Sequence, residues 1–143
     1  MSLTPQHVGS IGLYWCCYRL TRLGWNVMPT ARNARGIDIV AYSVDAQVMR
    51  ALQVKSLTRK IPVPLGPDLD RAMGDFWLIV TGAQSDNPET FVLTPQEVRD
   101  RAHRGERNGK VSHWLQPGQY DDRAFRGAWD RIGDPHGLSS RAQ

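Results

Sequence analysis

Apolar residues near the start of the chain recur at spacings of three and four, which is the period of an amphipathic helix. Four residues carry this pattern: Val8, Ile11, Trp15 and Tyr18. Thr4 and Pro5 precede them and supply an N-cap residue followed by a proline in the first turn. Gly24 is a natural residue for the C-terminal end of a helix. We therefore expect a helix from Thr4 to about Leu23.

The pattern changes to that of two short strands between residues 37 and 56. Residues 37–42 and 51–56 are largely apolar, with polar residues inserted between the apolar ones. A hairpin that closes near Asp45 and Ala46 would place residue 38 opposite residue 53. Because side chains alternate between the two faces of a strand, Gln53 and Lys55 share a face, and we expect Asp38 to project beside them.

Three further segments have the apolar character of buried strands, at residues 25–28, 76–80 and 91–93. The sequence Thr94-Pro95-Gln96-Glu97 is a capping box with proline at the first helical position, so it predicts the start of a helix. This helix is expected to run to about Arg104. The arginines that follow the capping box alternate with acidic residues, which favours a solvated face.

The remaining segments complete a predicted α/β sandwich. Prolines and glycines interrupt residues 57–75, where only a short helix at 68–73 is expected. Residues 84–88 predict a turn, 111–115 a short strand and 120–132 a last helix. Four residues of that last helix are expected to be buried: Tyr120, Phe125, Trp129 and Ile132. The order of elements predicts one α/β domain over residues 1–132, followed by a flexible C-terminal tail at 133–143.

Length and charge narrow the class of protein. The chain has 143 residues, about the size of one domain, and it contains no apolar run long enough to span a membrane. Residues 1–60 hold eight Lys and Arg against two acidic residues, a net charge of +6, whereas residues 61–143 carry −2. A basic half favours a polyanionic partner such as nucleic acid. The adjacent Cys16 and Cys17 are poorly placed for a disulfide, and the first residues lack the pattern of a signal peptide, so we expect a cytoplasmic protein.

The hairpin also carries candidate chemistry. An acid, an amide oxygen and an ammonium group, supplied by Asp38, Gln53 and Lys55, can together hold a divalent cation and a phosphate. A half-buried hairpin has a simpler interpretation, in which the polar side chains only face water. The continuous apolar run at residues 39–41 argues against that interpretation, since a sheet covered on both faces leaves a carboxylate buried unless it is paired or bound to metal.

The segments GIDIVAY and ALQVKS, preceded by a helix and a strand, resemble the PD-(D/E)XK nuclease superfamily over roughly residues 4–94. The resemblance is greatest to its small restriction-endonuclease-like and Holliday-junction-resolvase-like members. It implies a three-layer sandwich in which helices flank a mixed central sheet of about five strands. In that superfamily an Asp on the second strand, an acid two residues before a Lys on the third strand, and often a Glu on the first helix bind magnesium and cleave a phosphodiester.

Carried over to this chain, the resemblance implies Asp38, Gln53 and Lys55 as catalytic residues. The ligands of Mg (or Mn) would be Asp38, the side-chain oxygen of Gln53 and the backbone carbonyl of Val54. Gln53 stands where an acid is usual, as in some homing endonucleases of the superfamily. No Asp or Glu precedes Asp38, so the first helix brings no acid. Four basic residues are the expected DNA contacts: Arg32, Arg35, Arg59 and Lys60.

Three functions follow from these observations. The first is metal-dependent hydrolysis of phosphodiester bonds in DNA by an endonuclease. The alternative is a catalytically degenerate nuclease-fold module that binds DNA without cleaving it, which the missing helix acid and Gln53 favour. In the third, Asp38 and Lys55 form a buried ion pair in an interaction subunit. A homodimer would suit a small nuclease, because cutting two strands needs two sites.

Overall fold

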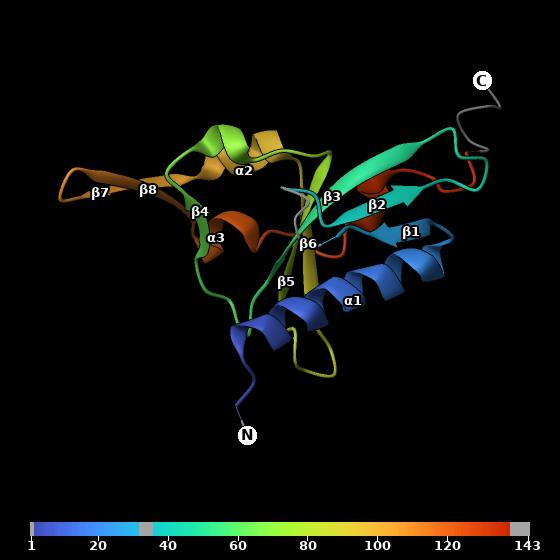
Figure 1. Ribbon diagram of the computed structural model, residues 1–143, viewed down its shortest axis with the longest axis horizontal. Helices are drawn as coiled ribbons and strands as arrows, with labels where there is room; N and C mark the ends of the chain where they lie inside the picture. The colour runs from blue at the N-terminus through green and yellow to red at the C-terminus, as the bar shows by residue number, and fades with distance from the viewer. Residues whose placement is uncertain (1, 32–35, 138–143) are drawn as a thin grey trace.

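The computed structural model describes residues 2–31 and 36–137 (Figure 1). Its centre is a five-stranded mixed sheet in the order β1-β2-β3-β5-β6. The five strands are β1 (Asn26–Pro29), β2 (Ile39–Tyr42), β3 (Met49–Ser56), β5 (Phe76–Thr81) and β6 (Glu89–Leu93). Neighbouring strands are antiparallel except β3 and β5, which are parallel. The predicted mixed sheet of about five strands is confirmed.

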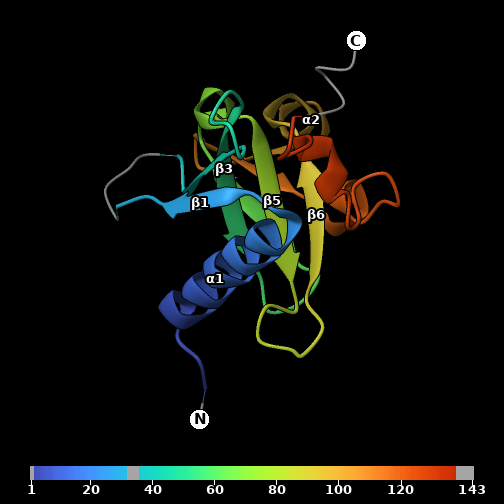
Figure 2. The same ribbon diagram turned by 90° about the vertical axis from the view of Figure 1, so that its right-hand side faces the viewer.

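Helix α1 (Pro5–Leu23) covers one face of this sheet (Figure 2). Thr4 accepts a hydrogen bond from the backbone of His7, and Gly24 ends the helix with a φ of 107°, so the predicted helix is confirmed at both ends. Cys16 and Leu20 are buried against the sheet residues of this face. Among the residues that the structure describes, none of the helices is long and apolar enough to cross a membrane.

The opposite face is covered by a mixed layer. It consists of a small second sheet in the order β4-β8-β7 together with short helices. The elements are β4 (Val63–Gly66), the 3-10 turn η1 (Leu69–Arg71), α2 (Pro95–Arg101), β7 (His103–Arg107), β8 (Lys110–Leu115) and α3 (Pro117–Tyr120). Trp77 and Ile79 of β5 are buried here, together with Val98 and Leu115. The predicted α/β sandwich with a mixed central sheet is confirmed, and the strand expected at 111–115 is present as β8, whereas β4 and β7 were not predicted.

The helix predicted to reach Arg104 ends at Arg101, and the chain turns into the β7–β8 hairpin. The hairpin closes at Asn108 and Gly109, whose φ angles are 54° and 76°. Two successive positive φ angles define a type I′ turn, whose twist matches that of the flanking strands and for which Asn-Gly is strongly preferred. This local turn preference, together with pairing of β8 to β4, outweighs the helical pattern after residue 101.

The helix predicted over residues 120–132 is absent. After α3 the chain turns at Asp122, and Gly127 donates its N–H to the carbonyl of Thr90 at 2.7 Å. This segment therefore satisfies backbone groups of β6, an edge strand whose outer N–H and C=O groups need partners. Only the last residues form a 3-10 turn, η2 (Trp129–Ile132). The four residues expected to be buried in that helix are buried nonetheless: Tyr120, Phe125, Trp129 and Ile132.

The structure describes the predicted tail only as far as residue 137. Pro135 accepts a hydrogen bond from the N–H of Val44 at 2.8 Å, so this part of the chain contacts the turn of the β2–β3 hairpin.

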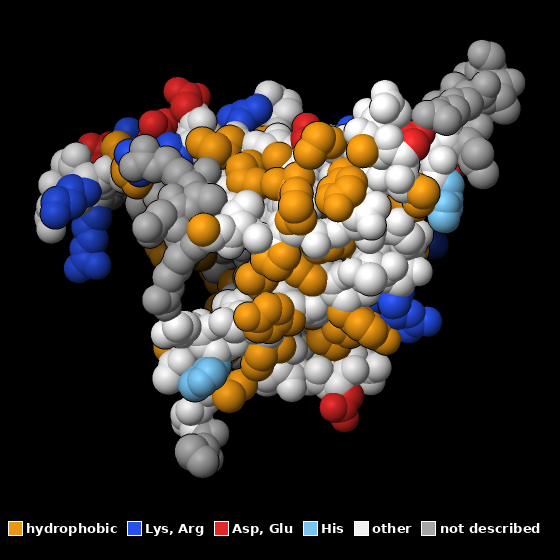
Figure 3. All heavy atoms as spheres, turned by 45° about the vertical axis from the view of Figure 1, so that its right-hand side comes forward, with side chains coloured by type: hydrophobic (Ala, Val, Ile, Leu, Met, Phe, Trp, Pro, Cys, Tyr) orange, Lys and Arg blue, Asp and Glu red, His pale blue; other side chains and the backbone are white. Residues whose placement is uncertain are grey.

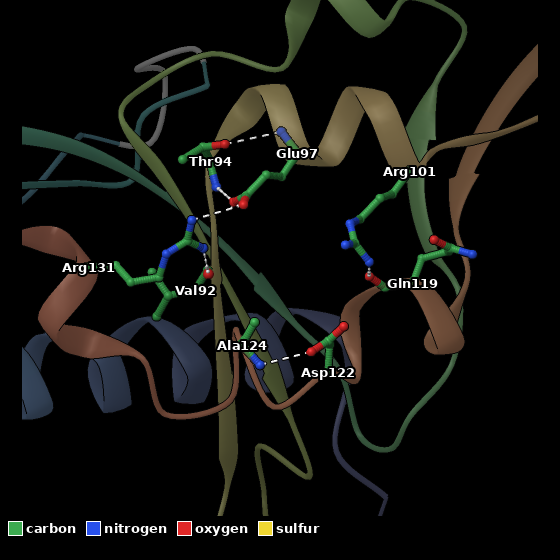
Figure 4. A network of polar contacts seen from close by, with 8 residues as sticks. All are labelled: Val92, Thr94, Glu97, Arg101, Gln119, Asp122, Ala124 and Arg131. Carbon is green, nitrogen blue, oxygen red and sulfur yellow. Dashed lines mark hydrogen bonds and ion pairs between the residues drawn. The ribbon is translucent and has the colours of Figure 1, made fainter.

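Arg131 ties the C-terminal segment to the start of α2 (Figure 4). Its guanidinium donates to the carbonyl of Val92 at 2.7 Å and to Oε2 of Glu97 at 2.9 Å. Burial alone would raise the pKa of Glu97, but the hydrogen bonds from Arg131 and from the backbone of Thr94 outweigh it and lower that pKa. Glu97 therefore stabilises the fold above its ordinary pKa, and this contribution is lost as the pH falls through the lowered value.

Replacing Arg131 with methionine is expected to lower the free energy of unfolding at pH 7 by about 1–3 kcal/mol, because the carbonyl of buried Val92 and the half-buried carboxylate of Glu97 lose a charged donor. The difference from the wild type should shrink as the pH falls through the lowered pKa of Glu97, because the protonated acid no longer attracts Arg131. Urea unfolding at pH 7 and pH 3 measures both effects. Arg123→Met, at an exposed position, is the control and should change stability little. Equal destabilisation at both pH values would contradict the role given to Glu97.

Candidate active site

The candidate site lies where β2 separates from β3. Within the ladder Ile39 is paired with Leu52, and the N–H of Asp38 donates to the carbonyl of the same Leu52 at 2.8 Å. Asp38 and Ile39 therefore both lie opposite Leu52, and two consecutive residues opposite one is the arrangement of a β-bulge. The predicted hairpin register is confirmed over residues 39–42. The bulge, however, changes the direction of Asp38, which bonds to Leu52 rather than continuing the alternation opposite Gln53.

The Asp38 carboxylate takes the place of a strand carbonyl. Its Oδ2 accepts the backbone N–H of Val54 at 2.7 Å. In a regular ladder this N–H would bond to the backbone of β2, so the carboxylate lies close to the plane of the sheet. On the other side, the carbonyl of Asp38 accepts the N–H of Thr30 at 2.9 Å. Hydrogen bonds from both neighbours thus hold the acid where β2 and β3 diverge.

Gln53 and Lys55 point away from α1. Leu52 is buried in the core beneath α1, and Ser56 Oγ donates to the carbonyl of Val8 in α1 at 2.6 Å. Since alternate residues share a face, Gln53 and Lys55 project together from the other face, as the alternation predicted. There the Nζ atom of Lys55 lies 5.2 Å from the centre of the Trp77 ring, a cation–π contact.

The charge of Asp38 acts on both faces of the sheet. Burial lowers the pKa of Lys55, and the negative charge of Asp38 opposes part of this shift. On the α1 side, burial raises the pKa of the Cys16 thiol, and Cys17 and then Asp38 add to that rise. A carboxylate near the plane of the sheet can interact with groups on either side. Asp38 therefore interacts electrostatically with Lys55 although the bulge takes it out of the regular alternation.

The side-chain oxygen of Gln53 is buried and has no hydrogen-bond partner among the described residues. Leaving a buried polar atom unsatisfied costs about 1–3 kcal/mol. Such an atom in a folded protein needs an explanation, and a bound cation or water is one. The side-chain oxygen of Gln53 is therefore available to accept a hydrogen bond or to bind a cation.

A cavity of about 520 Å³ opens beside Asp38 on the α1 side. Its lining residues are Gln6, Gly9, Ser10, Leu13, Asp38 and Val54. Helix α1 can approach β3 closely here because Gly12 has no side chain, and a Cβ atom at that position would collide with Ser56 Oγ. The polar side chains that α1 contributes are Gln6 and Ser10, so the cavity receives no carboxylate from the helix.

Two solved structures share this architecture. A bacterial homing endonuclease superposes with a TM-score of 0.61 over 99% of this chain and 98% of its own, at 16% sequence identity. A Holliday junction resolvase from the archaeal hyperthermophile Archaeoglobus fulgidus superposes with a TM-score of 0.53 over 81% of this chain and 92% of its own, at 15% identity. The fold is restriction-endonuclease-like. No protein-family model and no curated protein match the sequence.

The possible metal ligands at the site around Asp38 are oxygen atoms, which suit a hard cation. Over residues 2–31 and 36–137, no three His, Cys, Asp or Glu side chains form a metal-binding group, so Asp38 would be the sole carboxylate. The Gln53 side-chain oxygen and the Val54 carbonyl are oxygen donors of the same hard kind as the Asp38 carboxylate. Magnesium is commonly held by one or two carboxylates, with waters and substrate phosphate supplying the rest. By the chemistry of their donor atoms, these residues would suit such an ion.

The predicted DNA contacts differ from one another in their surroundings. Lys60 Nζ lies 3.1 Å from Asp121 and 3.4 Å from Glu89, and the hydrogen bond to Asp121 is the main cause that raises the pKa of Lys60. The positive charge of Lys60 is thus balanced by acidic side chains of the protein itself. Arg59 is exposed. Arg32 and Arg35 lie outside the described residues.

Sequence reasoning missed one group of basic residues. Arg107 is one of the arginines expected on a solvated face and is exposed, and Lys110, which the sequence pattern did not single out, is exposed as well. The structure places them opposite each other next to the turn of the β7–β8 hairpin. The signal that could have found them is the dipeptide Asn108-Gly109, a strong local indicator of a hairpin.

Proposed function

We propose that this protein is an endonuclease that hydrolyses phosphodiester bonds in DNA with the help of Mg²⁺ or Mn²⁺. The position of Asp38 carries this proposal: its carboxylate is held at the divergence of β2 and β3, bonded to Val54 and electrostatically coupled to Lys55. The shared fold with a homing endonuclease and a Holliday junction resolvase supports the same reaction class.

In this proposal Asp38, the Gln53 side-chain oxygen and the Val54 carbonyl hold the ion. A bound divalent cation supplies an activated water and offsets charge on the phosphate. Lys55 orients the attacking water or neutralises charge that develops on the phosphate. Asp38 has a second task, since its charge opposes part of the lowering of the Lys55 pKa that burial causes.

The same fold could bind DNA without cutting it, and one observation favours this second function. The cavity beside Asp38 is lined on its helix side by Gln6 and Ser10, which carry no charge. Such a site would hold a cation with one carboxylate where two are common, and cation binding weakens as the number of charged ligands falls.

Two further parts of the proposal concern the setting of the reaction. Cys16 and Cys17 are free thiols, which favours a reducing compartment such as the prokaryotic cytoplasm. Arg32, Arg35 and Arg59 would contact the DNA backbone near the site. Cutting both strands of a duplex would require two copies of the chain acting together.

Incubating the protein with supercoiled plasmid and with a branched DNA substrate tests the function directly. Nicking is expected in Mg²⁺ or Mn²⁺ and none in EDTA. Salt-dependent DNA binding without nicking in either metal would reject the endonuclease and support the binding module. Absence of both binding and nicking would support an interaction subunit.

Lys55→Met is expected to lower nicking by about 100-fold or more, because an electrostatic stabiliser is lost. The same change should keep or raise the melting temperature at pH 7. The folded state lowers the pKa of Lys55, so the charged lysine costs stability at neutral pH, and this cost disappears as the pH rises through the lowered pKa. The gain should therefore shrink between pH 7 and pH 10.

Thermal unfolding of Lys55→Met at several pH values, beside Lys110→Met at an exposed position, measures this effect. A marked loss of stability in Lys55→Met alone would mean that Lys55 serves the fold as an ion-pair partner of Asp38, which is the interpretation of an interaction subunit.

A further inference from the structure

The β7–β8 hairpin projects from the body of the molecule (Figure 1). Its residues 103 to 110 are exposed except for Gly105, which is half-buried. Lys and Arg side chains extend at the left edge of Figure 3, on the side of the hairpin, whereas apolar side chains fill the middle of that view. A projecting ribbon of this kind adds little to the core, so its side chains are free to contact something else.

The pairing register divides the hairpin into two different faces. Facing pairs alternate along an antiparallel ladder, so every second pair lies on the same side. One face carries His103, Gly105, Arg107, Lys110, Ser112 and Trp114. The other face carries Arg104, Glu106, Val111 and His113. We call the first the cationic face and the second the inner face.

The inner face is satisfied by the protein itself. Arg104 forms an ion pair with Glu106 at 3.4 Å. A ring nitrogen of His113 lies 3.1 Å from the carbonyl oxygen of Gly66 in β4. The charges on this side are therefore balanced or bonded to the neighbouring strand.

The cationic face contains no acidic residue, as its membership shows. Arg107 and Lys110 are directly opposed, and neither has an ion pair with any residue that the structure describes. Like charges at facing positions of a ladder destabilise it. A phosphate group placed between the two cations would relieve that repulsion.

Trp114 lies at the base of the same face. The residue is 40% exposed, and its indole N–H donates to Ser112 Oγ at 3.1 Å, which holds the ring along the ribbon. Gly105 leaves the middle of the face without a side chain on one strand. The face is thus a narrow ribbon with two cations at the tip and an aromatic ring at the base.

We propose that the cationic face of the β7–β8 hairpin contacts duplex DNA, with Arg107 and Lys110 on phosphates of the backbone. A two-stranded β-ribbon fits the width of the major groove, and unpaired cations on a projecting element are the common means of phosphate contact. This inference rests on the proposed function only in taking DNA as the ligand, because it does not require cleavage.

Binding of a 20-base-pair duplex by the full chain tests the inference. Arg107→Gln/Lys110→Gln is expected to weaken binding tenfold or more at low salt. The slope of log affinity against log salt concentration should fall by about 2, since two phosphate contacts are lost. The matched control is Arg104→Gln/Arg123→Gln, which removes the same charge from the inner face and from an exposed loop. It should weaken binding less than threefold.

Equal weakening in both double variants would overturn the inference, because net charge and not the cationic face would then govern binding. Preferential binding of single-stranded nucleic acid to the wild type would overturn it as well. Circular dichroism and thermal unfolding of each variant establish that the hairpin changes leave the fold intact.

The same experiments distinguish failure of the endonuclease proposal from failure of the inference about the hairpin. A wild type that binds the duplex through Arg107 and Lys110 but never nicks it would leave this inference standing and reject the endonuclease. A wild type that nicks DNA while the Arg107→Gln/Lys110→Gln protein binds and nicks normally would reject the inference and leave the endonuclease standing.

Discussion

Asp38→Asn is expected to lower metal-dependent nicking by about 100-fold or more while leaving duplex binding within a few-fold of the wild type. The amide oxygen of asparagine can still accept the N–H of Val54, so the bulge should survive. The change removes the single carboxylate of the proposed metal site and with it the charge that opposes the lowering of the Lys55 pKa. Loss of an electrostatic stabiliser has effects of about this size on catalysis.

Nicking rates in Mn²⁺ and duplex binding, measured on the same preparations, check this expectation. Asp86→Asn, an acid in an exposed loop, is the matched control and should nick like the wild type. Unchanged nicking in Asp38→Asn would place the catalytic centre elsewhere. Loss of binding and folding together would show that Asp38 is needed to close the sheet.

Gln53→Glu is expected to bind Mn²⁺ about tenfold more tightly than the wild type and to keep or raise nicking. A second carboxylate beside Asp38 strengthens attraction for the ion, and tenfold corresponds to about 1.4 kcal/mol. Without metal the variant should be less stable, since a carboxylate would replace a buried amide oxygen. Burial raises the pKa of such an acid, so this loss should be smaller at low pH and larger at neutral pH.

Calorimetric titration with Mn²⁺ measures the affinity, and melting temperatures with and without Mn²⁺ measure the coupled stability. Gln119→Glu, at an exposed position, is the matched control and should change neither. If Gln53→Glu gained no affinity, Gln53 could not be a ligand. If it gained affinity without any nicking, the module that binds DNA without cutting it would be the better description.

Local signals in the sequence determined the parts of the fold that short-range physics controls. The N-cap at Thr4 and the glycine at position 24 set the ends of α1, because capping depends on residues next to the helix. The register of β2 with β3 followed from apolar periodicity, since a slip by one residue would have turned every apolar side chain to the wrong face. The same alternation placed Gln53 and Lys55 on one face.

Only the tertiary structure decided the layer opposite α1 and the geometry of the site. The segment predicted as a last helix instead bonds to β6, because an open sheet edge offers backbone partners that no sequence period reveals. Asp38 departs from the regular ladder because it bonds to Leu52 and Val54 of β3 and to Thr30, the residue after β1. Whether Gln53 finds a partner depended on which distant side chains fill the second face. These outcomes arise from contacts between residues far apart in the chain, so local pattern could name the residues of the site but not their arrangement.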